Sequence, residues 1–163
     1  MEIVLLERHH NRKTFVCEID SLKDYLHRQV SQDIKRRLAN CFVAIDNANN
    51  VLGYYTLTSD SLGREAIPEK YLKQVPPSYS APVILLGRLA RHIHTKGTGL
   101  GEILLLDALF RSFTLSNESI GAMAVVVDPI NERAKRFYEK YGFELLPDSG
   151  KMFLPMKTIA QLI

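Results

Sequence analysis

Short apolar runs bounded by turn-forming residues recur along the whole chain, and longer stretches with apolar residues every three or four positions separate them. The first pattern predicts β-strands and the second predicts α-helices, so their alternation indicates an α/β fold. There is no internal repeat and no linker, and we therefore expect one domain that covers residues 1–163. Strands are predicted at residues 3–6, 41–45, 51–59, 83–90, 123–127, 143–146 and 152–156.

Helices are predicted between several of these strands. Ser21 is expected to cap a helix that runs to about Val30, and a second helix should cover residues 33–38. Near the other end of the chain, residues 131–140 form a helical pattern, and Gly142 is expected to end that helix in a left-handed conformation.

Two loops and one long helix complete the prediction. Residues 47–50 should turn the chain between the strands at 41–45 and 51–59, and residues 64–74 should form a short polar helix or loop. The long helix covers residues 100–116. Its apolar face is expected to comprise Leu100, Ile103, Leu106, Leu109, Phe110 and Phe113.

Composition narrows the class of protein. The 163 residues are 46% hydrophobic and 24% charged, as in an ordinary globular protein, and the net charge of +3 permits a polyanionic partner without requiring one. Cys17 and Cys41 form no CxxC pair, which excludes a zinc ribbon and disfavours a disulfide framework. The chain shows neither a signal peptide nor the roughly 18 apolar residues of a membrane span. We therefore expect a cytoplasmic protein without membrane contact.

The most informative segment is a glycine turn between the strand at residues 83–90 and the helix at 100–116. Gly97, Gly99 and Gly101 let the backbone direct its N–H groups at one point, where the helix N-terminus and Lys96 favour a phosphate. The Walker GxxxxGK[ST] and Rossmann GxGxxG patterns are both absent, which argues against a nucleoside triphosphatase and a dinucleotide site. A plain turn without a ligand is the alternative.

Two motifs carry a resemblance to a known family. Lys96-Gly-Thr-Gly-Leu-Gly101 resembles the [RQ]-x-x-G-x-[GA] motif with which GNAT acetyltransferases hold the pyrophosphate of coenzyme A, with Lys in place of the usual Arg or Gln. Residues 131–143 match the family's N-x-x-A-x-x-F-Y-x-x-x-G-F signature at every specified position. The resemblance implies acetyl-CoA as co-substrate, no metal, and a GNAT fold with a mixed sheet of about six or seven strands flanked by helices.

The same resemblance assigns roles to individual residues. Tyr138 matches the tyrosine that protonates the leaving thiolate, although a tyrosine that only packs in the core is the alternative. The backbone of Leu89, Ala90 and Arg91 should pair with the pantetheine arm. The complete set of cofactor-binding residues that the resemblance implies is Leu89, Ala90, Arg91, Lys96, Gly97, Thr98, Gly99, Leu100, Gly101 and Asn131.

A narrower resemblance concerns the substrate. Residues 53–57 and 86–90 are similar to TacT-type toxins of type II toxin–antitoxin pairs, which implies acetylation of the α-amine of aminoacyl-tRNA, a ribbon-helix-helix antitoxin and a homodimer. Residues 81–101 contain no Asp or Glu, which suits an amine that is partly neutral at pH 7. The basic residues expected first at tRNA phosphates are Lys35, Arg36 and Arg91.

Other interpretations stay open at this point. The chain could acetylate a small amine or a protein N-terminus, or it could be a non-catalytic CoA-binding or co-repressor module. His92 and His94 alternate along the chain, but two imidazoles without a third ligand predict solvated loop residues rather than a metal site. A role as general base or in RNA contact stays open for either histidine. The general base is not identified by the sequence.

Overall fold

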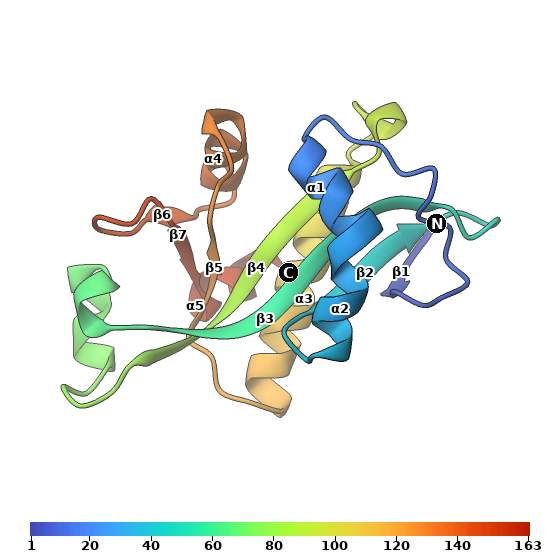
Figure 1. Cartoon of the computed structure of the whole chain (residues 1–163). Coiled ribbons are helices and arrows are strands. Elements are labelled where there is room, and N and C mark those ends of the chain that lie inside the picture. The colour runs from blue at the N-terminus through green and yellow to red at the C-terminus, as the bar shows by residue number, and fades with distance from the viewer. The chain divides into compact units, whose positions relative to one another are not determined.

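The computed structural model describes all residues, 1–163, and contains a mixed sheet with helices beside it (Figure 1). Its seven strands run in the order β1-β2-β3-β4-β5-β7-β6. This confirms the expected α/β sheet of six or seven strands. The strands are β1 (Glu2–Leu5), β2 (Asn40–Ile45), β3 (Val51–Leu62), β4 (Ala81–Arg91), β5 (Ala124–Val127), β6 (Glu144–Leu145) and β7 (Met152–Pro155).

The chain divides into two compact units. The first comprises Met1–Thr58 and Gly87–Ala108, and the second comprises Ser59–Leu86 and Leu109–Ile163. β3, β4 and the helix α3 (Leu100–Glu118) each contribute residues to both units. No helix is both long enough and apolar enough to cross a membrane.

In the first unit, a helical segment covers β2 and β3. It consists of α1 (Asp20–Asp24), a π-helical turn (Tyr25–Gln29) and α2 (Val30–Lys35), and Figure 1 shows it beside β2. The predicted Ser21 cap is wrong, because the helix begins at Asp20 and no side chain caps it. The predicted boundary after Val30 is also wrong. The π-turn lets the helix continue while Tyr25, Leu26 and Val30 all enter the core.

The β2–β3 hairpin forms as predicted. Its strands pair antiparallel from Asn40–Leu57 to Ile45–Val51, with an irregularity between Ala44 and Ile45. Asp46 closes the turn, because its Oδ1 accepts hydrogen bonds from the backbone N–H groups of Ala48 and Asn50 at 2.9 Å each.

The predicted apolar face of α3 is wrong in part. Its buried residues are Leu100, Leu104, Leu105, Ala108, Leu109 and Ser112, whereas Ile103, Leu106 and Phe110 are exposed. Apolar residues occupy almost every side of this helix, so the spacing alone fits more than one face. Packing selects the face that contains Leu104 and Leu105.

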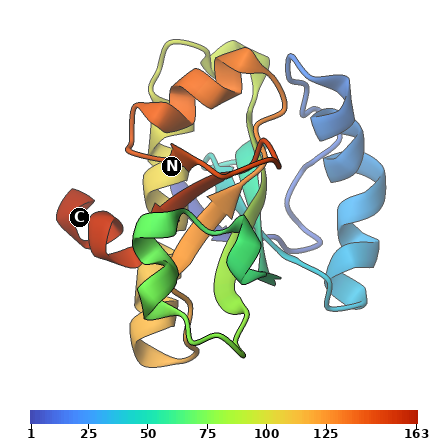
Figure 2. The same ribbon diagram turned by 90° about the vertical axis from the view of Figure 1, so that its left-hand side faces the viewer.

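In the second unit, β5 pairs with β7 and β7 pairs with β6, all antiparallel. The segment predicted as a polar helix or loop forms two 3₁₀-helices, Arg64–Ala66 and Glu69–Gln74, drawn in green in Figure 2. Lys70 Nζ lies 2.6 Å from Glu144 Oε1, which ties this segment to β6. A last helix, α5 (Met156–Leu162), replaces the end of the predicted final strand.

Candidate active site

β4 extends beyond its parallel partner. The β4–β5 ladder runs from Val83–Ala124 to Leu86–Val127 and stops there, whereas β4 continues to Arg91. Residues 87–91 therefore leave backbone groups on that edge for another extended chain. This stretch contains Leu89, Ala90 and Arg91, the residues expected along the pantetheine arm.

The glycine turn follows β4 directly. A single 3₁₀ turn (Ile93–Thr95) leads to Gly97 and Gly99, which adopt φ values of +82° and +83° that other L-residues rarely adopt. No atom lies within 4 Å of where a Cβ would stand on either glycine. Thr98 lies between them, and its Oγ1 donates a 2.6 Å hydrogen bond to the Thr95 carbonyl.

This turn has the properties of an anion site. α3 begins at Leu100 and is 19 residues long, so its first amides carry a partial positive charge that is not satisfied within the helix. The open space at Gly97 and Gly99 admits a bulky ligand to these amides, and the ammonium of Lys96 is exposed beside them. Gly101 lies in the first turn, where its Cβ position is 3.9 Å from Arg91 Cδ. The residues present therefore fit a pyrophosphate.

Tyr138 lies in the second unit, on α4 (Glu132–Glu139). Asn131 caps this helix, because its Oδ1 accepts a 2.8 Å hydrogen bond from the Ala134 N–H. The cap uses one of the two lone pairs of the Asn131 side-chain oxygen, so its amide nitrogen and the second lone pair are left for the expected pantetheine contact. Gly142, with φ +95°, follows the helix as predicted.

The environment of Tyr138 distinguishes it from the other buried tyrosines. Its ring packs edge-on against Phe137 and Phe143, each 5.3 Å away, and 8% of the residue is exposed. Tyr25 and Tyr54 donate hydrogen bonds to Asp33 and to the Leu22 carbonyl, whereas the Tyr138 hydroxyl has no partner in the protein. Ser112 Oγ is the only fully buried side-chain polar atom without a hydrogen-bond partner, so the Tyr138 hydroxyl reaches the surface, where a ligand can contact it. Burial also raises the pKa of Tyr138, so the phenol stays protonated near neutral pH.

The three residues expected at tRNA phosphates differ in their surroundings. Lys35 and Arg36 are exposed at the end of α2. Arg91 is half-buried, and its guanidinium lies 3.4 Å from the Glu18 carboxylate. That ion pair leaves Arg91 less available to a phosphate than the other two.

Sequence reasoning missed an aromatic–ionic cluster beside β4. The Arg88 guanidinium lies 3.6 Å from the centre of the Tyr25 ring, and the Tyr25 hydroxyl donates a 2.8 Å hydrogen bond to Asp33 Oδ2. Hydrogen bonds from Gln29 and Tyr25 lower the pKa of Asp33, which favours its charged form. The only signal in the sequence is Arg88 within the otherwise apolar run of residues 83–90.

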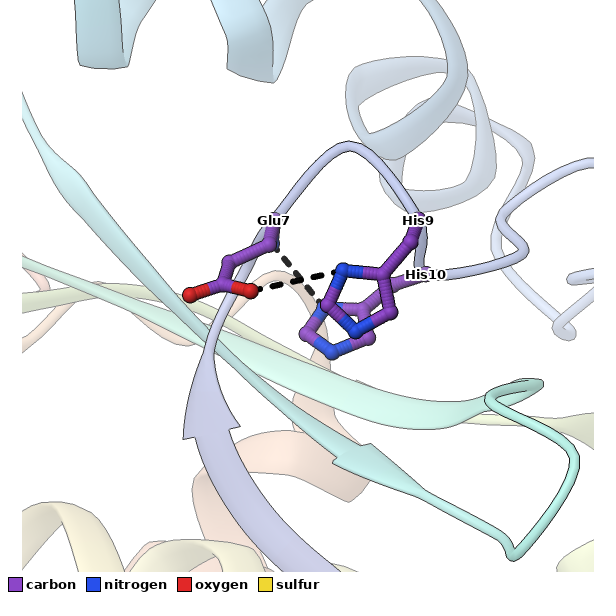
Figure 3. Close-up of side chains that lie close together, drawn as sticks. All are labelled: Glu7, His9 and His10. Atoms are coloured by element: carbon purple, nitrogen blue, oxygen red, sulfur yellow. Dashed lines mark hydrogen bonds and ion pairs between the residues drawn. The ribbon is translucent and has the colours of Figure 1, made fainter.

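The structure brings Glu7, His9 and His10 together in the loop after β1 (Figure 3). One potential ligand atom from each lies within 4.8 Å of the others. However, His10 Nδ1 already accepts a 2.9 Å hydrogen bond from the Glu7 N–H, and His9 Nδ1 lies 3.3 Å from the Glu7 carboxylate. The Nδ1 atoms of both histidines are therefore already engaged within the loop. We therefore assign this cluster to the loop's own hydrogen bonding.

Comparisons with known proteins agree with this geometry. The model of the acetyltransferase (GNAT) family matches residues 5–143. A tRNA-acetylating toxin from Mycobacterium tuberculosis is 35% identical over 144 residues, which cover 88% of this chain and 84% of the relative.

Two solved structures extend the similarity over the whole fold. AtaT complexed with acetyl-methionyl-tRNAfMet is 27% identical with a TM-score of 0.90, and the alignment covers 99% of this chain and 98% of that one. AtaTR bound with acetyl-CoA is 28% identical with a TM-score of 0.87, and the alignment covers 99% and 96%.

Proposed function

Because this chain belongs to the acetyltransferase (GNAT) family, we propose that it transfers the acetyl group of acetyl-CoA to the α-amine of aminoacyl-tRNA and thereby stops translation. The observation that carries the proposal is the end of β4, where five residues beyond the β5 ladder lead into an open glycine turn at the start of α3. Such a site suits acetyl-CoA. The free strand edge of β4 can pair with the pantetheine arm, and the first backbone amides of α3 can bind the pyrophosphate.

The reaction places two demands on the protein. The amine nitrogen forms a bond to the thioester carbonyl carbon, the carbon–sulfur bond breaks, the amine loses a proton, and the departing sulfur gains one. Tyr138 is suited to supply the proton to sulfur, because its hydroxyl has no partner in the protein and burial holds it in the protonated form. Acetyl-CoA supplies the activated acetyl group, and no metal is needed for this step.

The acceptor is inferred from charge and from the relatives. Residues 81–101 carry no carboxylate, and Glu18, which reaches the end of β4, is paired with Arg91. A lysine-type amine, with a pKa of about 10.4, would need a base there, whereas an α-amine near about 7.7 is already partly neutral. The relative named tRNA-acetylating toxin and the AtaT complex with acetyl-methionyl-tRNAfMet support an aminoacyl-tRNA acceptor. Such a substrate places the protein in the cytoplasm.

The decisive experiment offers several acceptors to the purified protein with labelled acetyl-CoA. Charged tRNA should accept the label at its α-amine, while uncharged tRNA should accept none. The reaction should weaken as salt rises, because Lys35 and Arg36 would release counterions from tRNA phosphates. A Lys35→Ala/Arg36→Ala double variant should flatten this salt dependence and leave acetyl-CoA binding unchanged.

Polyamines, aminoglycosides and peptides serve as competing acceptors in the same assay. Faster acetylation of a free small amine or a peptide than of any charged tRNA would replace this proposal with a small-molecule or N-terminal acetyltransferase. Binding of acetyl-CoA without transfer to any acceptor would favour a non-catalytic CoA-binding or co-repressor module.

We also propose that an antitoxin of the ribbon-helix-helix class neutralises the enzyme, which is consistent with the names of its relatives as toxins. We propose in addition that two copies of this chain form a homodimer. We expect that expression of the chain alone arrests bacterial growth and that coexpression of its cognate antitoxin restores it. Growth counts and incorporation of labelled amino acids measure both effects. Growth arrest that also persists in a Tyr138→Phe variant would show that the toxicity does not come from acetyl transfer.

A further inference from the structure

His92 lies where β4 ends and the chain turns toward the glycines, and both of its ring nitrogens are engaged. Nε2 is 3.1 Å from the Thr14 carbonyl oxygen, and Nδ1 accepts a 3.1 Å hydrogen bond from the His94 N–H. One neutral tautomer satisfies both contacts, with the proton on Nε2. His92 is therefore a half-buried residue with two defined partners, which the sequence did not predict. Its partner Thr14 is 78 positions away in the sequence.

The Thr14 contact determines what the other nitrogen can do. A carbonyl oxygen only accepts, so it keeps the proton on Nε2 and leaves the Nδ1 lone pair for the His94 N–H. The ring is held from the side as well, because Phe15 packs edge-on against it at 5.8 Å and is itself fully buried. His92 is thus oriented as a cap for the 3₁₀ turn Ile93–Thr95.

A short series of hydrogen bonds continues from this cap into the glycine turn. Thr95 Oγ1 donates to the His92 carbonyl at 2.6 Å, and its backbone N–H donates to the same oxygen at 2.9 Å. The Thr95 carbonyl in turn accepts from Thr98 Oγ1 at 2.6 Å and from the Thr98 N–H at 3.1 Å. The position of Thr98, between Gly97 and Gly99, therefore depends on the turn that His92 caps.

Residues 14–18 contact the end of β4 at two further points. The Ile93 N–H donates a 2.9 Å hydrogen bond to the Val16 carbonyl, and Arg91 pairs with Glu18. Together with the contact from His92 to Thr14, these interactions attach one extended segment to three successive residues at the end of β4. The segment continues into α1, which begins at Asp20.

We propose that His92 is a positioning residue for the donor site: its Nδ1 caps the turn Ile93–Thr95 and so sets the glycine turn in the conformation that receives the pyrophosphate. Its Nε2–H, held by Thr14, orients the ring for this task. His92 itself contacts neither acetyl-CoA nor the acceptor. The inference rests on the proposed function only in taking the glycine turn as the pyrophosphate site.

Three substitutions at His92 separate the two contacts. Asn places an acceptor oxygen where Nδ1 stands, so His92→Asn keeps the cap in the form of an Asx turn. Gln can reach Thr14 as a donor but does not reproduce the cap, and Ala removes both contacts. The control is His94→Ala, which keeps the backbone N–H that the cap uses and removes only the ring of His94, whose centre lies 4.9 Å from that of His92.

Calorimetric titration with acetyl-CoA, which needs no acceptor, measures the outcome. His92→Ala and His92→Gln should weaken binding by about 5- to 10-fold, the equivalent of one lost hydrogen bond, while His92→Asn and His94→Ala should bind within about twofold of the parent. In turnover assays, the KM for acetyl-CoA should rise while kcat stays nearly constant. Thermal unfolding of each variant shows whether it is folded.

Specific results would overturn the inference. Unchanged affinity in folded His92→Ala, recovery by Gln but not by Asn, or a fall in kcat at constant KM would each show that the cap does not act in this way. Failure of the parent protein to bind acetyl-CoA at all would instead contradict the proposed function. If His92→Ala does not fold, the comparison of the Asn and Gln variants decides.

Discussion

Replacing Gly99 by aspartate is expected to abolish acetyl-CoA binding. The substitution places a Cβ and a carboxylate in the space that the glycine leaves open beside the first amides of α3. The negative charge would then occupy and repel the position of the pyrophosphate. The fold should survive, because no atom lies within 4 Å of the new Cβ and aspartate tolerates the left-handed region better than most residues. Calorimetric titration with acetyl-CoA measures the loss.

Gly150 provides a matched control for this experiment. It also has a positive φ, +78°, and no atom within 4 Å of its Cβ position, but it lies in the turn between β6 and β7. Gly150→Asp should therefore impose the same backbone cost and the same charge while leaving binding unchanged. A Gly99→Asn variant adds a side chain of nearly the same size without the negative charge, so it separates the effect of charge from the effect of size. Normal acetyl-CoA binding by a folded Gly99→Asp protein would remove the glycine turn from the donor site.

The second large effect is expected at Tyr138. Tyr138→Phe removes only the hydroxyl, so the ring contacts with Phe137 and Phe143 should persist and acetyl-CoA should still bind. If the phenol protonates the thiolate, kcat should fall by about 10²- to 10⁴-fold. Because that hydroxyl has no hydrogen-bond partner in the protein, its removal should cost little stability. Single-turnover acetyl transfer to charged tRNA is the direct measurement.

A nearby tyrosine tests the specificity of that effect. Tyr141 packs its ring against the same Phe137, at 5.6 Å, and Tyr141→Phe should retain most of the turnover. The raised pKa of Tyr138 also fixes the direction of the pH dependence: the group loses its proton only above the usual range for tyrosine, so it should cause no loss of activity on the alkaline side below about pH 10. Near-normal turnover in Tyr138→Phe would assign the protonation to water or another group.

The sequence predicted the strands, the hairpin and the glycine turn because each depends on neighbouring residues. The strand at residues 83–90 and the helix end at Gly142 could be predicted without knowledge of the fold. The buried face of α3 could not, since Ile103 and Leu104 are equally apolar and only packing separates them. The role of His92 was missed for a related reason. Its orientation depends on Thr14, and nothing near His92 in the sequence indicates that contact.

The candidate donor site consists largely of backbone groups, so few amino-acid substitutions should alter it directly during evolution. The edge of residues 87–91 and the first amides of α3 are present whatever side chains accompany them. The side chain of Leu89 should therefore matter less than its backbone, whereas Gly97 and Gly99 are restricted by their positive φ. Inactivation by a single substitution should therefore arise at these glycines, at Tyr138 or in the buried core, and rarely at the side chains along the strand edge.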